Sequence, residues 1–373
     1  MTEQLFHHKT NFQHTLKGFL IMKIDQKNII DKVESGLKAC LQRVPFLEIE
    51  LLEKDLYVAD RRIDISVTVR IAGQRKRLAV EIKTNGQPRV ARMAVDALAL
   101  IRASNPEIYG VFSAPYISPQ AAEICIKEKM GYLDLAGNCR LAFDQVYIEQ
   151  SGNPNPFAQK RDLRSLYSPK AARVLRVLLM NPKKSWRLQA LAQEAKVSLG
   201  QIANVKRLLE DREWLASSTA GLSLSDPESL LAEWSESFDS RKNLSRNYYT
   251  LKSISEIEGE LSRACENEGI AYALTGFSGA ARYAPSVRYQ RAMAYVSQNM
   301  GKVADMLDLK EVDSGANISL FTPYDEGVLY GAQPIDGISI ASPVQVYLDL
   351  VGVKGRGEEA ATTLLDEVIK RSW

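Results

Sequence analysis

In the first third of the chain, hydrophobic residues change from helical spacing to strict alternation. They recur three or four positions apart over 30–41, which predicts an amphipathic helix that ends before Pro45. Over 63–69 they alternate with polar residues, as expected of a half-buried strand. The pair Ala72-Gly73 predicts a turn into a second strand over 78–83. A helix followed by a β-hairpin is therefore expected here.

The same analysis predicts that this unit continues as a mixed α/β sheet. The expected elements are a helix from Pro88 to about Ala103, a strand over 108–112, a helix opened by Ser118-Pro119, and short strands near Tyr132 and Val146.

The middle of the chain has the pattern of three short helices and a hairpin. Ser168-Pro169 is a helix start, and that helix ends at Asn181-Pro182. A second helix over 188–195, a short turn, and a third helix over 198–211 follow. Residues 214–224 then predict a β-hairpin with its tip at Ser217-Ser218-Thr219.

In the last third, a strand over 270–274 precedes a Gly276–Gly279 turn, a helix, and a strand over 292–296. This order invites comparison with nucleotidyltransferases, but 292–296 has none of the paired aspartates that their catalysis needs. The turn is neither a GxGxxG nor a P-loop motif. The two glycines are also explained by a tight strand-to-helix turn, so an inactive α/β domain is expected.

Two polar stretches divide the chain. Turn residues over 152–156 predict a linker, and the polar stretch 235–247 predicts a second boundary between domains. A chain of 373 residues is also too long for one ordinary core. The expected fold is multidomain, α/β and α+β, with boundaries at 22–152, 160–238 and 245–373.

Composition limits the chemistry. With 45% hydrophobic and 25% charged residues, and no apolar run near the roughly 20 residues of a membrane span, a globular cytoplasmic protein is expected. Four widely spaced cysteines favour core thiols over a zinc module or disulfides. The only histidines, His7, His8 and His14, lie in a poorly patterned leader, and Met22 is a candidate natural start. Catalysis must then use carboxylates, lysines and hydroxyls.

Charge is unevenly distributed. The net charge is +3, but residues 160–214 hold 13 Lys and Arg against five Asp and Glu. A basic segment in an otherwise acidic chain is typical of a polyanion-binding module, and the alternative is a solvated charged face.

Three residues of the predicted hairpin form a candidate catalytic site. If the two strands pair through the turn, Asp64, Glu81 and Lys83 converge on one side of the sheet. Two carboxylates and the Ile82 carbonyl would hold Mg²⁺ or Mn²⁺ as metal ligands, and Lys83 would steady the attacking water. The alternative is a surface ion-pair cluster at the sheet edge.

The segment Ile63-Asp64, a 16-residue gap, then Glu81-Ile82-Lys83 before a helix resembles the PD-(D/E)XK, restriction-endonuclease-like superfamily over about residues 25–150. Ile63 replaces the usual proline. The resemblance implies a metal-dependent deoxyribonuclease fold, with Glu34 as a candidate assisting carboxylate. It also leaves open a nuclease fold that only binds DNA.

The middle segment resembles a winged helix-turn-helix, whose third helix would enter the major groove of double-stranded DNA. Gln201 and Asn204 would then contact bases, and Arg187, Lys206 and Arg207 would contact phosphates. Ser198 either caps the helix or binds a phosphate. Winged helices also serve as protein-contact modules.

The last third resembles AbiEi-type antitoxin regulators of type IV toxin–antitoxin systems. The residues that carry this resemblance are 274–281 (LTGFSGAA), 346–350 (VYLDL) and 356–360 (RGEEA). The resemblance implies operator DNA as a partner. A cognate toxin or another protein, and a second copy of this chain, are further candidate partners. Those regulators usually lack a nuclease-like domain in front.

Three hypotheses follow from the sequence. The first is a DNA-binding protein whose winged helix directs a Mg²⁺-dependent deoxyribonuclease. The second is a non-enzymatic regulator, such as an antitoxin-like repressor, in which the nuclease fold only grips DNA. A third hypothesis is a scaffold that contacts other proteins.

Overall fold

The structure, a computed structural model, describes residues 26–58, 61–156, 166–219, 221–285, 288–353 and 355–373. The three histidines, the candidate start at Met22, and three of the basic residues counted above (Lys160, Arg161 and Arg164) lie outside this part of the chain. No helix in the described part is long and apolar enough to span a bilayer.

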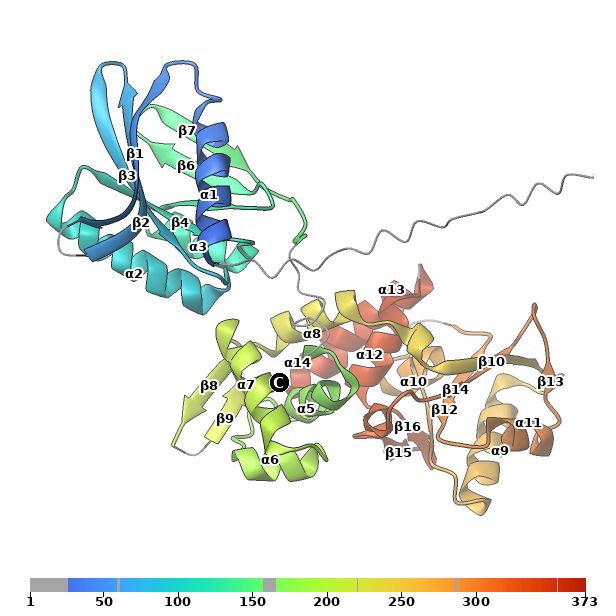
Figure 1. The fold of residues 1–373 in the computed structure, drawn as a ribbon. Coiled ribbons are helices and arrows are strands. Elements are labelled where there is room, and N and C mark those ends of the chain that lie inside the picture. The colour runs from blue at the N-terminus through green and yellow to red at the C-terminus, as the bar shows by residue number, and fades with distance from the viewer. Residues whose placement is uncertain (1–25, 59–60, 157–165, 220, 286–287, 354) are drawn as a thin grey trace, which may run out of the picture.

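The N-terminal unit is built on a seven-stranded mixed sheet in sequential order β1 to β7 (Figure 1). The first three strands and the last three pair antiparallel, while β3, β4 and β5 pair in parallel. The strands are β1 (Leu47–Val58), β2 (Arg61–Ile71), β3 (Gln74–Ile82), β4 (Ile108–Ala114), β5 (Gly131–Asp134), β6 (Cys139–Phe143) and β7 (Val146–Gln150). The helices are α1 (Gln26–Leu41), α2 (Pro88–Ser104) and α3 (Pro119–Lys127).

Helices cover both faces of this sheet, which explains why its inner strands are buried on both sides. The apolar stripe of α1 packs on one face, and the stripes of α2 and α3 pack on the other. Even Ser66, a polar position of the predicted alternation, is 2% exposed. The predicted helices and strands of this unit are confirmed.

One strand, β1, has no counterpart in the sequence prediction. It is an edge strand, and its pairing with β2 shifts register between Ile49 and Leu51. Such a bulge reverses the phase of in-and-out alternation, so the strand loses the period of two that would identify it.

The middle of the chain folds as three helices and a two-stranded hairpin, at the predicted places. They are α5 (Pro169–Met180), α6 (Leu188–Glu194), α7 (Leu199–Asp211), β8 (Leu215–Ser218) and β9 (Gly221–Leu224). Trp186, just before α6, exchanges two backbone hydrogen bonds with Leu222, of 2.7 and 3.0 Å. These bonds fix the hairpin against the helices.

A second seven-stranded mixed sheet forms the C-terminal part, in the order β13-β10-β14-β12-β11-β16-β15. Its strands are β10 (Leu244–Tyr249), β11 (Tyr272–Leu274), β12 (Ala292–Val296), β13 (Lys310–Glu311), β14 (Ile318–Thr322), β15 (Gln333–Ile335) and β16 (Ile338–Ile340). The helices of this part are α9 (Ile254–Asn267), α10 (Gly276–Tyr283), α11 (Met300–Met306), α12 (Pro343–Val351), α13 (Arg356–Leu364) and α14 (Lys370–Ser372). Both large sheets are mixed, so the predicted mixed α/β class is confirmed.

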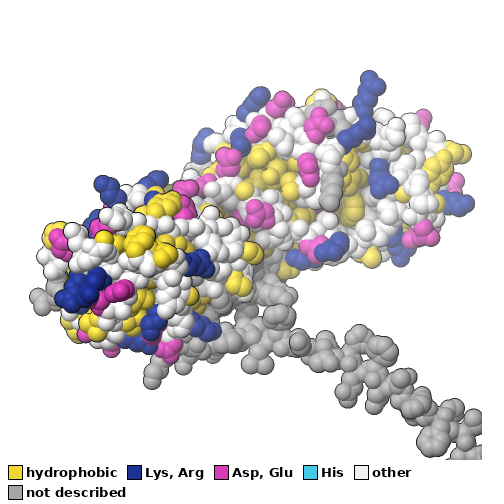
Figure 2. Space-filling model, turned by 90° about the horizontal axis from the view of Figure 1, so that it is seen from above, with side chains coloured by type: hydrophobic (Ala, Val, Ile, Leu, Met, Phe, Trp, Pro, Cys, Tyr) yellow, Lys and Arg dark blue, Asp and Glu magenta, His cyan; other side chains and the backbone are white. Residues whose placement is uncertain are grey.

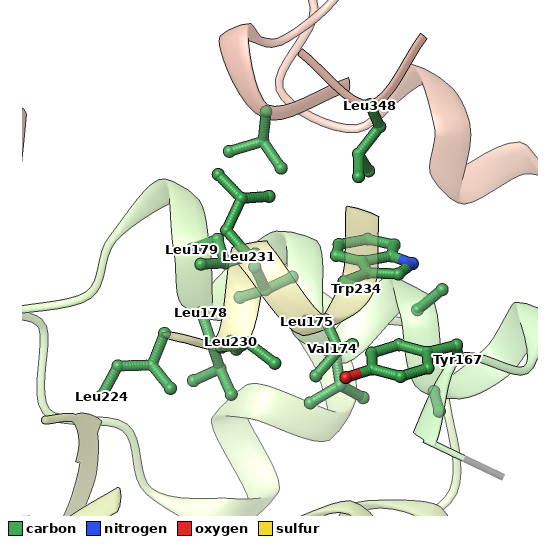
Figure 3. Packing of buried hydrophobic residues seen from close by; sticks show 14 of the residues in the cluster. Tyr167, Val174, Leu175, Leu178, Leu179, Leu224, Leu230, Leu231, Trp234 and Leu348 are labelled. Atoms are coloured by element: carbon green, nitrogen blue, oxygen red, sulfur yellow. The ribbon is translucent and has the colours of Figure 1, made fainter. Parts of the chain in front are cut away.

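The three-helix unit and the C-terminal part share one hydrophobic core. Helix α8 (Pro227–Ser237) lies between α5 and the C-terminal helices, and its Trp234 is 1% exposed. Figure 3 shows Leu231 and Trp234 between Leu175 of α5 and Leu348 of α12, and Leu230 belongs to the same cluster. The core cluster therefore crosses the boundary that the sequence suggests between 238 and 245.

The polar stretch 235–247 differs from the expected separator. It contains the end of α8, a short 3₁₀ helix (Ser240–Lys242) and the start of β10, which pairs with both β13 and β14. The side chains of 244–247 are exposed, so their polarity marks an outer strand as readily as a linker.

Candidate functional sites

The hairpin of β2 and β3 brings the predicted carboxylate residues together. Ala72 and Gly73 both have positive φ in the connecting turn, of 47° and 84°. The pairing of Ile65 with Val80 continues toward Asp64 and Glu81 at the open end of the hairpin. There the Ile82 backbone N–H donates a 2.7 Å hydrogen bond to Oδ2 of Asp64.

Lys83 completes the cluster. Its Nζ donates a hydrogen bond to Oε1 of Glu81, two residues earlier on the same side of the strand. The Glu81 side chain is 13% exposed and that of Lys83 is 37% exposed, so the cluster lies at the surface with its carboxylate partly shielded. Asp64, Glu81, Ile82 and Lys83 are therefore neighbours, as their spacing predicts.

The chemistry of this cluster suits a hard divalent cation with few protein ligands. The Ile82 N–H faces Asp64, and the carbonyl of a strand residue projects to the same side as its N–H. Asp64 and Glu81 thus lie at the same end of the hairpin, and Mg²⁺ is usually held by one or two carboxylates with waters. Within the described ranges, no three or more His, Cys, Asp or Glu side chains are grouped so as to hold a metal ion. These few donors fit a Mg²⁺ ion that keeps several water ligands.

Glu34, the assisting carboxylate that the nuclease resemblance suggests, has other partners. It accepts from Lys38 and Lys54, each at 2.6 Å. Hydrogen bonds from Lys38 and then Lys54 hold the pKa of Glu34 below its usual value. Its described contacts therefore join α1 to β1 and do not include Asp64 or Glu81.

On α7, Ser198 is an N-cap: its Oγ accepts a 3.2 Å hydrogen bond from the Gln201 N–H. Gln201 and Asn204 are partly exposed, and Arg207 donates to Oδ1 of Asn204 at 3.4 Å. Arg187, the residue before α6, is exposed. The two amides are thus available at the surface of the helix.

The remaining cations on α7 are partly neutralised. Lys206 pairs with Glu210 at 2.7 Å, and Arg207 pairs with Asp211 at 3.5 Å. Each pair is one turn apart along an exposed helix, a geometry that contributes only about 0.3–0.5 kcal/mol. A phosphate can compete for these cations.

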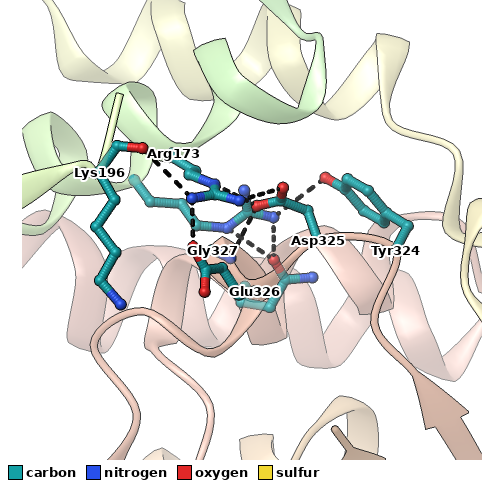
Figure 4. Close-up of polar contacts among 8 residues, drawn as sticks. Arg173, Lys196, Tyr324, Asp325, Glu326 and Gly327 are labelled. Atoms are coloured by element: carbon teal, nitrogen blue, oxygen red, sulfur yellow. Dashed lines mark hydrogen bonds and ion pairs between the residues drawn. The ribbon is translucent and has the colours of Figure 1, made fainter. Parts of the chain in front are cut away.

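The local excess of positive charge overstates the charge at the surface, because three arginines act inside the fold. Arg173 makes a bidentate pair with Asp325, both bonds 2.7 Å, and a further pair with Glu326 (Figure 4). Arg176 is 0% exposed and donates to Gln345, and Arg212 pairs with Glu233 at 3.0 Å. On the face drawn in Figure 2, Lys and Arg side chains are interspersed with Asp and Glu.

Exposed cations lie at the start of α5, in the loop between α5 and α6, at the turn between α6 and α7, and on α7. They include Lys170, Lys183, Lys184, Arg187, Lys196 and Arg207. A shallow depression of about 710 Å³ lies at the α6–α7 turn, lined by Lys170, Lys196, Ser198 and Gln201 among others. Two lysines therefore line an open hollow beside the start of α7.

The N-terminal unit contacts the far end of α7. Arg92 of α2 donates to both carboxylate oxygens of Glu213, at 2.8 and 3.1 Å. Arg89 lies 3.9 Å from Glu210, and Asn85, two residues after Lys83, donates to Asp211 at 3.5 Å. The carboxylate cluster therefore lies close in sequence to a segment that touches α7. The sequence gives no sign of this contact, because its residues are common surface types.

A buried polar cluster in the C-terminal part was also missed. Asp349 is buried and accepts hydrogen bonds from Thr275 (2.5 Å), Tyr295 (2.8 Å) and Gln345 (2.9 Å). Burial raises the pKa of Asp349 to about 6. In the sequence, this cluster is indicated only by an aspartate within the mainly apolar segment Val344–Val351.

Three solved structures are similar to part of this chain, at TM-scores of 0.20–0.21. A repair endonuclease from Pyrococcus abyssi is 10% identical and covers 27% of this chain and 46% of its own. An EndoMS–dsDNA2 complex is 13% identical (26% and 42%), and EndoMS in apo form is 16% identical (28% and 45%). The chain thus spans less than half the length of each. No curated protein matches the chain.

A protein-family model matches the C-terminal part of the chain. The segments 274–281, 346–350 and 356–360, which suggest AbiEi regulators, all fall inside one matched region. Residues 223–370 match the family model described as "Transcriptional regulator, AbiEi antitoxin, Type IV TA system", which confirms the predicted resemblance for this part of the chain.

Proposed function

We propose that this protein binds double-stranded DNA through the three-helix unit and its hairpin, acting as a winged helix-turn-helix, and cleaves DNA at the N-terminal carboxylate cluster. The observation that carries the cleavage proposal is the meeting of Asp64, Glu81 and Lys83 at the open end of one hairpin.

The residues of the cluster have distinct roles in this proposal. Asp64, Glu81 and the Ile82 carbonyl would hold Mg²⁺ or Mn²⁺, which when bound polarises the scissile phosphate and acidifies a water. Lys83 orients the Glu81 carboxylate by hydrogen bonding and places a positive charge where negative charge develops on the phosphate. The Ile82 N–H fixes one oxygen of Asp64 and leaves the other available.

DNA recognition is proposed for α7 and the cations around it. Gln201 and Asn204 present amides that can pair with adenine in the major groove. Arg187, with Lys183 and Lys184, is exposed beside the helices and supplies phosphate contacts, to which Lys206 and Arg207 add once their glutamate and aspartate partners are displaced. Ser198 serves as the cap that orders the first turn of α7.

A second candidate function is a non-enzymatic regulator, such as an antitoxin-like repressor, with a cognate toxin or another protein as its partner. The match of residues 223–370 to antitoxin regulators favours it. In this candidate the N-terminal unit adds only DNA contacts.

Cleavage of supercoiled plasmid in Mg²⁺ or Mn²⁺ separates the two candidates. We expect relaxation or linearisation by the full chain and at least about a hundredfold loss in Lys83→Ala, since removal of one transition-state contact costs roughly 3–4 kcal/mol. Lys127→Ala, an exposed lysine on α3, is the matched control and should keep full activity.

Binding to duplexes selected from a random pool, followed by fluorescence anisotropy, tests DNA recognition. Asn204→Ala should weaken the selected duplex by about 1–3 kcal/mol and leave random duplexes unchanged. Arg187→Ala should weaken all duplexes alike and reduce the salt slope by about one. Arg263→Ala, exposed on α9, is the control.

The outcomes are distinct. Lys83-dependent cleavage supports the first candidate. A salt-sensitive, sequence-specific shift with no cleavage in either metal supports the second. Absence of DNA affinity near physiological salt contradicts both and favours a protein-binding scaffold.

A further inference from the structure

Two buried thiols touch inside the N-terminal unit. Sγ of Cys40, near the end of α1, lies 3.5 Å from Sγ of Cys139, the first residue of β6. The residues are 99 positions apart and are 5% and 3% exposed. No bond joins them in the structure, where all four cysteines are free.

The surroundings of this pair favour a thiolate on one sulfur. A hydrogen bond from Cys40, assisted by the positive charge of Arg43, lowers the pKa of Cys139 below its ordinary value, against the opposing effect of burial. The same hydrogen bond and burial raise the pKa of Cys40. Arg43 is held nearby: its Nη1 donates a 2.9 Å bond to Gln150, which pairs with Cys139 across β6 and β7. A thiolate beside a cation is the reactive form of cysteine.

The other two cysteines lack these features. Cys125 and Cys265 are each 0% exposed, and burial raises their pKa values to about 12 and about 11. Neither has a second sulfur as a described partner. They are internal controls within the same chain.

We propose that Cys40 and Cys139 are a redox modification site, which a peroxide converts into a disulfide that joins α1 to β6. The Cys139 thiolate attacks one peroxide oxygen, the O–O bond breaks, and the leaving oxygen departs as hydroxide (or alkoxide from an organic peroxide), giving a sulfenic acid. The sulfur of Cys40 then attacks the sulfenic sulfur, loses its proton, and displaces the hydroxyl group as water. Two thiols are oxidised by two electrons and the peroxide is reduced by two.

The geometry requires only a short movement. The two sulfurs must approach from 3.5 Å to about 2.05 Å, the S–S bond length. Both residues belong to the core that α1 forms with the sheet, so the bond would join elements that already pack together. The disulfide should therefore form without loss of the fold and should restrict the unfolded chain.

The test is titration of the native full-length chain with hydrogen peroxide, followed by intact mass, thiol counting after denaturation, and peptide mapping. We expect the mass to fall by two hydrogens, two of the four thiols to disappear, and one Cys40–Cys139 cross-linked peptide that a dithiol reductant removes. The oxidised protein should unfold at a higher temperature than the reduced one.

Variants make the test specific. Cys139→Ser should abolish the bond, and Cys40→Ser should leave a sulfenic acid on Cys139 that a dimedone probe labels. Cys125→Ser should form the disulfide as the wild type does, and circular dichroism checks that each variant is folded. Native protein that keeps all four thiols, or loses them without preference, would overturn the proposal, as would a cross-link to Cys125 or Cys265.

Discussion

Asp349 is a buried carboxyl group in an environment that differs strongly from water. Its carboxyl group accepts three side-chain hydrogen bonds, yet burial outweighs them and raises its pKa to about 6 from the usual 3.8. Arg176 lies near enough to lower this pKa in part. The folded protein therefore binds this proton more tightly than the unfolded chain does.

Because the folded protein binds this proton more tightly, its stability should fall as the pH rises. The contribution of Asp349 to stability is full below about pH 4 and is lost as the pH rises through about 6. In Asp349→Asn this dependence is absent. Urea unfolding of both proteins should show their stability difference changing by about 2 kcal/mol between about pH 4.5 and 7.5, in favour of the variant at the higher pH. Parallel pH profiles would contradict the assignment, and Asp305→Asn, at an exposed site, should run parallel to the wild type.

At this scale the candidate catalytic residues could be predicted and the internal arginines could not. Asp64 and Glu81 are neighbours because strand alternation and a two-residue turn fix the register, and both are visible in a single sequence. Arg173 and Arg176 have the same appearance in sequence as DNA-binding arginines. Their partners, Asp325 and Gln345, are about 150 and 170 residues away, so only the fold identifies them.

Among the elements, the hairpin of β8 and β9 depends on one glycine. Gly221 has a φ of +142°, and an added Cβ would lie 2.4 Å from the Trp186 carbonyl oxygen. That carbonyl accepts one of the two backbone hydrogen bonds that dock the hairpin. A side chain at 221 cannot be accommodated without moving the hairpin from the helices.

Gly221→Ala should accordingly destabilise the protein by about 1–3 kcal/mol, through strain and the loss of docking bonds. Denaturant unfolding measures this loss. The matched control is Gly200→Ala on α7, where the nearest atom to an added Cβ is Ser198 Oγ at 3.9 Å. The control should be neutral or slightly stabilising. Equal stability of the two variants would show that the hairpin is not held in this way.

The elements that the sequence predicts are those with a clear period. Helix α2 and strand β2 have helical spacing and alternation throughout, and both were expected. Strand β1 has a bulge that breaks its alternation, and β10 has exposed polar positions that resemble a linker. Local pattern fails where a strand lies outside the core or changes phase.

For the whole molecule, the N-terminal unit is held to α7 by polar contacts. In the pairs of Arg92 with Glu213 and Arg89 with Glu210, the arginines are more than half exposed and the glutamates are partly exposed. Exposed pairs contribute at most about 1 kcal/mol each and are screened by salt. Raising the ionic strength should therefore weaken the attachment of the N-terminal unit to α7.

Small-angle scattering tests this expectation. The radius of gyration should increase when salt is raised to roughly 0.5 M, since screening then acts within a few ångströms. Arg92→Glu should give the larger value already at low salt, and Arg92→Glu with Glu213→Arg should restore the smaller one. Arg263→Glu changes charge elsewhere and should have no effect. A radius independent of salt and of Arg92 would mean that other contacts hold the units.

The contact between α5 and the C-terminal part is of a different kind. It combines an apolar core with the enclosed Arg173–Asp325 pair, whose side chains are 9% and 8% exposed. Residues 166–234 should consequently not fold as an independent unit. If they were excised at the polar stretch or grafted onto another protein, the Leu230–Trp234 surface of α8 would lose its covering and Arg173 would lose its counter-ion. If this region were exchanged between proteins during evolution, the fold would be preserved only when the helices and the antitoxin-like segment were transferred together.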